Sequence, residues 1–294
     1  MKSIKGIEVM AIKFTKMHGL GNDFVMIDMR NQSNERFADL PNLSIELAHR
    51  KFGIGCDQAV FMANSQLADL KISIFNVDGS EPEICGNAAR CAAQLYFKEI
   101  GADIGAVMTL DTLAGVVSCR RAEDGLIRVD MGEPRLEWDQ IPLRDECDTL
   151  FVPIIIPTSS NPDDSENLPI CVNVGNPHCV FIVGPKVESF PIEEIGAEVE
   201  HLELFPARTN VEFVHVQDRA NIRMRVWERG SGVTMACGSA ACASAVAVMR
   251  RGYTDRTVTV HMDGGDLIIE WNAENNRIYM TGPTAKVFEG SIEI

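Results

Sequence analysis

The fold is decided by residues 227–239, Trp-Glu-Arg-Gly-Ser-Gly-Val-Thr-Met-Ala-Cys-Gly-Ser, which join a strand-like segment to an apolar helix through two glycines. Residues 222–227 alternate apolar and charged side chains, the pattern of a half-buried strand. After Cys237 comes an alanine-rich run that ends at Arg250-Arg251-Gly252, where cations and glycine suit a helix end. A helix that is apolar on every face belongs in a core, so we expect a buried helix that begins at Cys237.

The same pattern occurs earlier in the chain. Residues 70–75 are strand-like, residues 78–80 form a turn, and Cys85 opens a second helix of small residues that closes at Gly101. Each cysteine therefore stands at the N-terminus of a buried helix. Unpaired backbone N–H groups and the helix dipole lower the pKa of a thiol in that position.

Further echoes indicate that the whole chain is a duplication. Gly21-Asn22 recurs as Gly175-Asn176 after 154 residues, and Cys85-Gly86 recurs as Cys237-Gly238 after 152. Asp130-Met131-Gly132-Glu133-Pro134 resembles Tyr279-Met280-Thr281-Gly282-Pro283 when the methionines are matched. The three echoes keep their order and nearly the same offset. A chain of 294 residues is also long enough for two domains of about 100–150 residues.

The predicted fold class is α+β, with two pseudo-symmetric homologous domains and the active site in the cleft between them. Each domain is expected to be a mostly antiparallel, β-barrel-like sheet wrapped around a central buried helix. One half takes residues 10–133 plus 283–294, and the other takes residues 134–282. Residues 1–9 are interpreted as an N-terminal extension, and residues 161–167 as an exposed loop.

Composition excludes several classes of partner. A net charge of -15 argues against nucleic acid and anionic membranes, which need clustered lysine and arginine. No apolar run reaches the roughly 18 residues of a membrane span, and no signal-peptide pattern is visible, so a soluble, cytoplasmic protein is expected. Nine scattered cysteines without a Cys-x-x-Cys pair resemble neither a secreted disulfide framework nor a zinc site, and no metal is expected.

Two thiols at equivalent helix starts in related halves suggest a pair that faces across a cleft. Such a pair suits inversion of a carbon centre, where one group removes a proton and the other returns one on the opposite face. The two helix N-termini could also hold a carboxylate between them. We expect Cys85 and Cys237 to rest as one thiolate and one thiol, and the other seven cysteines to be buried and inert.

Motifs along nearly the whole chain resemble those of diaminopimelate epimerases. They are His18-Gly19-Leu20-Gly21-Asn22-Asp23-Phe24, Asn76-Val77-Asp78-Gly79-Ser80 leading to Cys85-Gly86-Asn87, Gly175-Asn176-Pro177-His178, Arg208-Thr209-Asn210-Val211-Glu212, and residues 228–238. The resemblance begins near Met10, and two cysteine motifs in one sequence make it specific.

The resemblance implies a cofactor-independent epimerase that interconverts LL- and meso-2,6-diaminopimelate in bacterial lysine and peptidoglycan precursor synthesis, without pyridoxal phosphate or metal. Cys85 and Cys237 would be the two bases, and His178 and Glu228 would tune their ionisation. It also implies closure of two lobes around the substrate and a homodimer. The residues implied to contact the substrate are Asn22, Gln58, Asn76, Gly86, Asn87, Asn176, Asn210, Glu228, Arg229, Gly238 and Ser239.

Two departures from the family pattern bear on specificity. Ala88 replaces a usual glycine, and Ser239-Ala240 replaces a usual Thr-Gly pair, so added methyl groups could narrow the pocket. One alternative is a racemase of another amino acid, of the histidine or proline type, on the same fold. A second alternative is a redox-regulated binding protein in which Cys85 and Cys237 form a disulfide.

Overall fold

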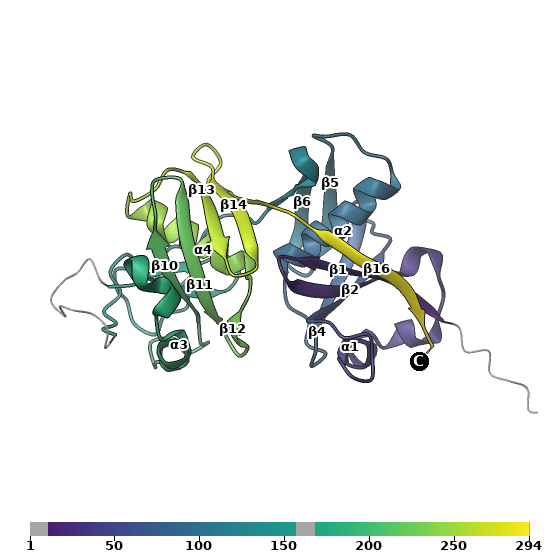
Figure 1. Ribbon diagram of the computed structural model, residues 1–294, viewed down its shortest axis with the longest axis horizontal. Coiled ribbons are helices and arrows are strands. Elements are labelled where there is room, and N and C mark those ends of the chain that lie inside the picture. Colours follow the sequence, from purple (N-terminus) through teal and green to yellow (C-terminus); the bar gives the residue numbers. More distant parts are fainter. Residues whose placement is uncertain (1–10, 157–167, 294) are drawn as a thin grey trace, which may run out of the picture.

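The computed structural model describes residues 11–156 and 168–293. Figure 1 shows two lobes side by side, and the chain fills one lobe, then the other, before its last strand returns to the first. The predicted extension of residues 1–9 and the predicted loop of residues 161–167 lie outside the described residues. None of the described helices has the length and apolar character needed to cross a membrane.

The first lobe contains seven strands, two α-helices and short 3-10 turns before the chain leaves it. Its elements are β1 (Ile12–Gly19), β2 (Asn22–Asp28), η1 (Met29–Asn31), η2 (Glu35–Ala38), α1 (Leu40–Ala48), β3 (Gln58–Ala63), β4 (Leu70–Asn76), α2 (Gly86–Glu99), β5 (Val107–Thr112), β6 (Gly115–Arg121), η3 (Glu123–Gly125) and β7 (Ile127–Asp130).

The second lobe repeats this order, with one additional short strand and a final strand that leaves it. Its elements are β8 (Ile170–Asn173), β9 (Pro177–Ile182), η5 (Gly184–Ser189), α3 (Ile192–Glu200), β10 (Asn210–Val216), β11 (Asn221–Glu228), β12 (Gly232–Thr234), α4 (Gly238–Arg250), β13 (Thr257–Met262), β14 (Gly265–Trp271), β15 (Ile278–Gly282) and β16 (Ala285–Ile292).

The strands form one continuous sheet that passes through both lobes. β7 pairs antiparallel with β15 where the lobes meet, and β16 crosses back to pair with β1. Most strand pairs are antiparallel, but β2–β3 and β4–β5 are parallel, as are the equivalent pairs β9–β10 and β11–β13. The matching positions of these parallel pairs show that the lobes share one topology.

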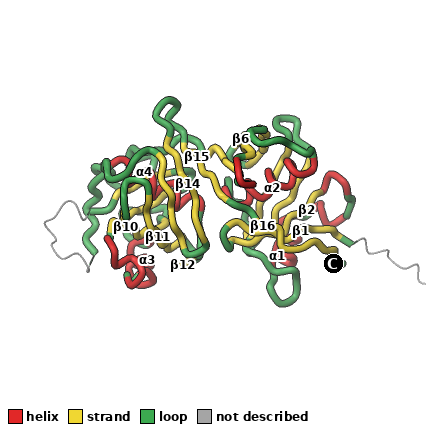
Figure 2. Tube along the Cα trace, turned by 45° about the horizontal axis from the view of Figure 1, so that its top comes forward, coloured by secondary structure: helices red, strands yellow, loops and turns green. Residues whose placement is uncertain are grey.

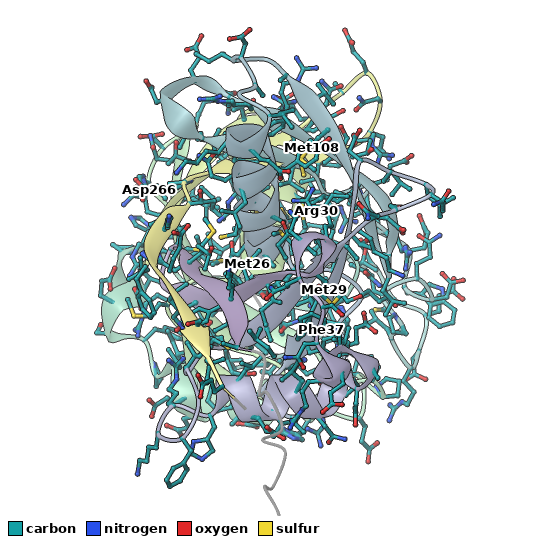
Figure 3. All side chains as sticks on the ribbon, turned by 90° about the vertical axis from the view of Figure 1, so that its right-hand side faces the viewer. Met26, Met29, Arg30, Phe37, Met108 and Asp266 are labelled. Atoms are coloured by element: carbon teal, nitrogen blue, oxygen red, sulfur yellow. The ribbon has the colours of Figure 1, made fainter. Side chains whose placement is uncertain are left out.

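The apolar core is built around α2 and α4. One cluster contains the small side chains of both helices together with strand residues from both lobes, among them Met26, Met108 and Met280. Figure 2 shows each helix enclosed by the strands of its own lobe, and Figure 3 shows Met26 and Met108 beside α2. Separate apolar clusters lie under α1 and α3, on strands that include β3 in the first lobe and β10 in the second.

The predicted α+β fold with two repeated halves is confirmed, and so are both helices that begin after a cysteine. Gly101 and Gly252 follow these helices with φ of 63° and 70°, the left-handed conformation expected of a glycine cap. The parallel pairs were not expected. The helix α1 begins at Leu40, because the side chain of Asp39 caps its start.

Candidate active site

The two cysteines occupy the same position in their lobes. Cys85 is the N-cap of α2 with φ and ψ of -130° and 111°, and Cys237 is the N-cap of α4 with -132° and 119°. The carbonyl group of each accepts the first helical hydrogen bond, from Ala89 at 2.9 Å and Ala241 at 3.0 Å. Both thiols therefore stand where backbone N–H groups at the helix start lack helical partners.

The helix starts lie against one shared side chain, that of Met280. A Cβ atom on Gly86 would come within 2.3 Å of Met280 Cε, and a Cβ on Gly238 within 3.0 Å of Met280 Sδ. A Cβ atom on Gly238 would also lie 3.6 Å from Asn87 Oδ1, so α4 begins beside the first turn of α2. The fold thus brings the two cysteine-bearing turns together, and glycine at each allows this close approach.

Burial dominates the ionisation of Cys85. Loss of solvent raises the pKa of its thiol to about 11, although the backbone N–H groups of Asn87 and Ala88 and the charge of Arg90 act to lower it. Glu228 adds a smaller contribution that raises the pKa. Cys85 Sγ lies 3.8 Å from Asn22 Oδ1, a long contact in which the thiol is the donor.

Cys237 is also held in its neutral form. Burial raises its pKa well above the ordinary value, and the carboxylate of Glu228 raises it further. The hydroxyl of Ser239, 3.4 Å from the sulfur, opposes this effect. All nine cysteines are free thiols in the structure.

A chain of amide side chains runs beside Cys85. Asn22 Nδ2 donates to Asp57 Oδ2 at 3.1 Å, and Asn22 Oδ1 accepts from Asn87 Nδ2 at 3.2 Å. Asn87 Oδ1 in turn accepts from Arg90 Nη2 at 2.7 Å. Each amide therefore has a fixed orientation, set by a carboxylate at one end and a guanidinium at the other.

Gln58 and Asn76 face each other on the paired strands β3 and β4. Gln58 Nε2 donates to Asn76 Oδ1 at 2.8 Å, and Asn76 Nδ2 donates to Ser80 Oγ at 2.9 Å. Gln58 Oε1 is buried and has no hydrogen-bond partner. A buried acceptor without a donor is costly, so this oxygen is a suitable place for a ligand's N–H group.

In the second lobe, His178 lies between two oxygen atoms. Its Nδ1 is 2.6 Å from Glu212 Oε1 and its Nε2 is 2.8 Å from Asn176 Oδ1. His178 and Glu212 are both fully buried, and Glu212 Oε2 has no partner. The imidazole of His178 is thus hydrogen-bonded to Asn176 and Glu212 rather than to either cysteine.

The loop after β11 is held by Asn210. Its Nδ2 donates to the Pro177 carbonyl at 2.9 Å and its Oδ1 accepts from the Arg229 backbone N–H at 2.9 Å. Arg229 Nη1 donates to the Ala207 carbonyl. Glu228, the last residue of β11, accepts a hydrogen bond from the hydroxyl of Thr234 on β12.

Sequence reasoning gave no role to Arg90, Glu212 or Asp57, which hold the amide and imidazole groups of the site. A lone arginine in a helix of small residues, and a lone glutamate in the apolar strand β10, were the available signals. Both side chains are fully buried. The methyl groups of Ala88 and Ala240 are also fully buried, so they lie in the core.

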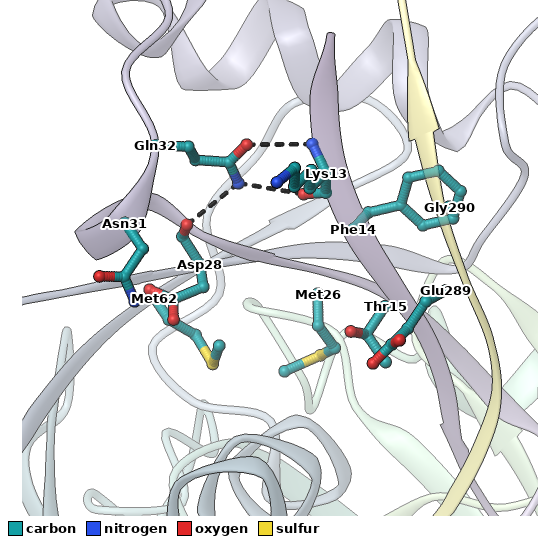
Figure 4. A pocket seen from close by; sticks show the side chains of 10 residues that line it. All are labelled: Lys13, Phe14, Thr15, Met26, Asp28, Asn31, Gln32, Met62, Glu289 and Gly290. Carbon is teal, nitrogen blue, oxygen red and sulfur yellow. Dashed lines mark hydrogen bonds between the residues drawn. The ribbon is translucent and has the colours of Figure 1, made fainter. Parts of the chain in front are cut away.

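Two cavities elsewhere contain none of the predicted site residues. The cavity in Figure 4, of about 320 Å³, lies against β1, β2 and β16, and Gln32 there bonds to the backbone of Lys13 and to the carbonyl of Asp28. The other, of about 390 Å³, lies between residues 153–156 and α3. Within residues 11–156 and 168–293, no group of three histidine, cysteine or acidic side chains is arranged to hold a metal ion.

Comparison with known proteins identifies relatives over both lobes. The family model described as diaminopimelate epimerase matches residues 14–137 and 170–287. A protein of Moorella thermoacetica named diaminopimelate epimerase is 46% identical over 285 residues, which cover 96% of this chain and 99% of that protein. One from Methanococcus maripaludis, with the same name, is 45% identical over 288 residues, which cover 96% of this chain and 100% of that protein.

Solved structures share the fold at much lower sequence identity. A phenazine biosynthesis protein of the PhzF family from Bacillus anthracis has a TM-score of 0.71 at 16% identity, covering 97% of this chain and 100% of that one. A hydroxyproline epimerase from Agrobacterium vitis has a TM-score of 0.62 at 14% identity, covering 96% and 91%. These likenesses establish the architecture alone.

Proposed function

The chain belongs to the diaminopimelate epimerase family, and from that premise we propose that it interconverts LL- and meso-2,6-diaminopimelate through Cys85 and Cys237. It is an isomerase of amino-acid metabolism, and its place is in lysine and peptidoglycan precursor synthesis. The observation that carries the mechanism is that the two cysteines cap matching helices whose first turns pack against Met280.

The reaction requires two proton transfers at one carbon. One cysteine, as thiolate, removes the α-proton, and the other, as thiol, donates a proton to the opposite face of the carbanion. No electrons are exchanged, and each turnover leaves the first cysteine protonated and the second ionised. Backbone N–H groups at Gly86-Asn87 and Gly238-Ser239 stabilise the charge that develops on the carboxylate, because helix starts favour anions. The reaction needs no cofactor and no metal.

The remaining site residues suit a zwitterionic substrate with two amino and two carboxylate groups. Gln58 Oε1, which is buried without a donor, accepts from a substrate ammonium group. Asn22 and Asn87 supply amide groups at the start of α2, and Asn76, Asn176 and Asn210 supply further amide groups to the substrate. Arg229 binds the distal carboxylate, for which a guanidinium is well shaped.

We infer a homodimer formed along β16. This strand is at one end of the described strand order, and Val287 and Phe288 on it are 56% and 46% exposed. An edge strand with exposed apolar side chains favours pairing with another copy. Phe288→Glu should then halve the mass in light scattering, whereas an unchanged mass would reject this interface.

We infer two domains, residues 10–133 plus 283–294 and residues 134–282, that close around the substrate. The inferred location is the cytoplasm, where lysine precursors are made.

Turnover by single cysteine variants tests the proposed function. Cys85→Ala and Cys237→Ala should each abolish epimerisation of diaminopimelate while circular dichroism and thermal unfolding stay near wild type. Cys242→Ala, at a buried cysteine within α4, is the matched control and should retain activity. Turnover of proline or histidine by the wild-type protein, with none of diaminopimelate, would instead support the racemase alternative.

A further inference from the structure

Arg90 is a buried cation without an acidic partner. Its side chain is fully buried in α2, and within the described residues no carboxylate oxygen lies within ion-pair distance of it. Its guanidinium donates instead to Asn87 Oδ1 at 2.7 Å, Met280 Sδ at 3.4 Å and the Pro283 carbonyl at 3.5 Å. A charge buried in this way is costly to the fold, because neutral acceptors replace only part of its hydration.

The fold makes room for this guanidinium. A Cβ atom on Gly19 would lie 3.0 Å from Arg90 Nη2, and one on Gly282 would lie 3.3 Å from Nε. Gly19 ends β1 and Gly282 ends β15, so strands of both lobes form the slot. The guanidinium thus lies where the lobes meet, on the helix that begins at Cys85.

The repeat shows that this charge belongs to one half only. The offset of 152 residues that matches Cys85 to Cys237 also matches Arg90 to Cys242, which is neutral and fully buried. The second cysteine has an acidic neighbour instead, because Glu228 raises the pKa of Cys237 beyond the effect of burial. The symmetric helix starts therefore stand in opposite electrostatic surroundings.

We propose that Arg90 is a positioning residue whose unpaired charge makes Cys85, rather than Cys237, the cysteine that ionises first in the resting pair. The role of this charge in catalysis rests on the proposed function, in which one cysteine must begin as thiolate and the other as thiol. Arg90 also fixes the amide of Asn87, whose backbone N–H faces the Cys85 sulfur.

Other side chains near Arg90 and Cys85 come from neighbouring helices and strands. Cys91 on α2, Cys119 on β6 and Cys242 on α4 lie within the field of Arg90, and burial keeps all three thiols neutral. Glu228 on β11 opposes ionisation of Cys85, but its influence there is weaker than that of Arg90. The Asn22 oxygen, 3.8 Å from the sulfur, is too distant to hold the thiol form strongly.

Alkylation by iodoacetamide tests the proposal without substrate. The rate at each cysteine is followed against pH by peptide mass spectrometry, and the midpoint of each profile reports ionisation independently of access. In the wild-type protein the midpoint of Cys85 should lie below that of Cys237. In Arg90→Met the rate at Cys85 below its midpoint should fall about tenfold, as for a pKa raised by about one, with Cys237 unchanged.

Two further variants separate charge from structure. Arg90→Lys keeps the charge and should retain most of the Cys85 rate. Arg250→Met removes a partly buried arginine, which bonds to Thr149 and the Cys171 carbonyl at the far end of α4, and should leave both profiles unchanged. An unaltered Cys85 midpoint in Arg90→Met, an equal loss in Arg90→Lys, or a lower midpoint for Cys237 in the wild type would overturn the proposal.

The test and the proposed function can fail separately. Alkylation needs no diaminopimelate, so the predicted midpoints could be found in a protein that does not turn over this substrate. Conversely, epimerisation with an unaltered Cys85 profile in Arg90→Met would retain the function and reject the role of Arg90.

Discussion

The imidazole of His178 and the carboxylate of Glu212 form a fully buried pair, with Nδ1 of the ring 2.6 Å from Oε1. The other ring nitrogen faces Asn176 Oδ1 at 2.8 Å. Both ring nitrogens thus meet oxygen atoms, and burial raises the pKa of the Glu212 carboxyl while the neighbouring imidazole acts to lower it. The ring thereby holds the Asn176 side chain in one orientation.

Glu212→Gln should therefore weaken substrate binding more than catalysis. The substitution removes the carboxylate that holds the ring at Nδ1, so the ring in turn holds the Asn176 side chain less firmly. We expect KM for diaminopimelate to rise about tenfold, equal to about 1.4 kcal/mol, with a smaller change in kcat. A kinetic comparison with unchanged KM would contradict this role of the pair.

Glu228→Gln should make Cys237 ionise at lower pH. Burial is the larger cause of its raised pKa and remains in the variant, but the neighbouring negative charge is removed. The alkylation midpoint of Cys237 should fall, while Cys85, where Glu228 acts least, should change little. Thr234→Val is a control that removes the hydrogen bond to Glu228 but keeps its charge. A midpoint that stays constant in Glu228→Gln would show that burial alone sets this pKa.

Stability should fall at alkaline pH because buried thiols resist ionisation. Burial raises the pKa of Cys85 and Cys56 to about 11, and that of Cys91, Cys119 and Cys242 to about 12, from 9.0. A raised folded-state pKa means that the stabilisation is complete below about pH 9 and is lost as pH rises towards the folded values. Each such thiol lowers the free energy of unfolding by about 1.4 kcal/mol per pH unit in that range.

Urea unfolding under reducing conditions measures this slope. Cys91→Ala should be less stable at neutral pH because it leaves a small cavity, but its stability should fall less steeply above about pH 9, by the contribution of one proton. Equal slopes in the variant and the wild type would show that Cys91 ionises as readily in the folded protein as in the unfolded chain.

Gly264→Ala should disturb the contact between lobes beside the site. The added Cβ would lie 2.0 Å from the Leu20 carbonyl oxygen and 3.1 Å from that of Met235, and backbone atoms move only with their segments. Leu20 precedes the Gly21-Asn22 turn, and Met235 precedes Cys237 by two residues. We expect a loss of about 1–3 kcal/mol in unfolding free energy, together with a lower kcat. An unfolding free energy and a kcat equal to those of the wild type would show that the backbone at Leu20 moves to admit the methyl group without loss of stability or activity.

The sequence predicts the elements well because their signals are local. Apolar side chains on every face mark α4 as buried, and alternation marks β11 as a strand. Strand direction is not local, which is why the parallel pairs were missed: period-two patterns say which face is buried but not which neighbour is beside it. The start of α1 at Leu40 depends on one cap, the side chain of Asp39.

The residues of the candidate site also differ in whether a local sequence signal predicts them. Cys85 and Cys237 were found from local sequence, since a cysteine at a helix start is visible in one segment. The partners of Arg90 and Glu212 were not, because they come from distant segments: Met280 is 190 residues from Arg90, and His178 is 34 residues from Glu212. The first contact depends on β15 of the second lobe packing against α2, and the second on the parallel pairing of β9 with β10; no single motif contains either.

Proton NMR in deuterium oxide tests the central claim, that one of Cys85 and Cys237 removes the α-proton and the other donates a proton to the opposite face of the same carbon. LL-diaminopimelate, reductant and wild-type protein should show loss of the α-proton signal with appearance of the meso isomer. Cys85→Ala and Cys237→Ala should each lose epimerisation. Absence of α-proton exchange with the wild-type protein, or epimerisation at a near wild-type rate in either variant, would contradict the account.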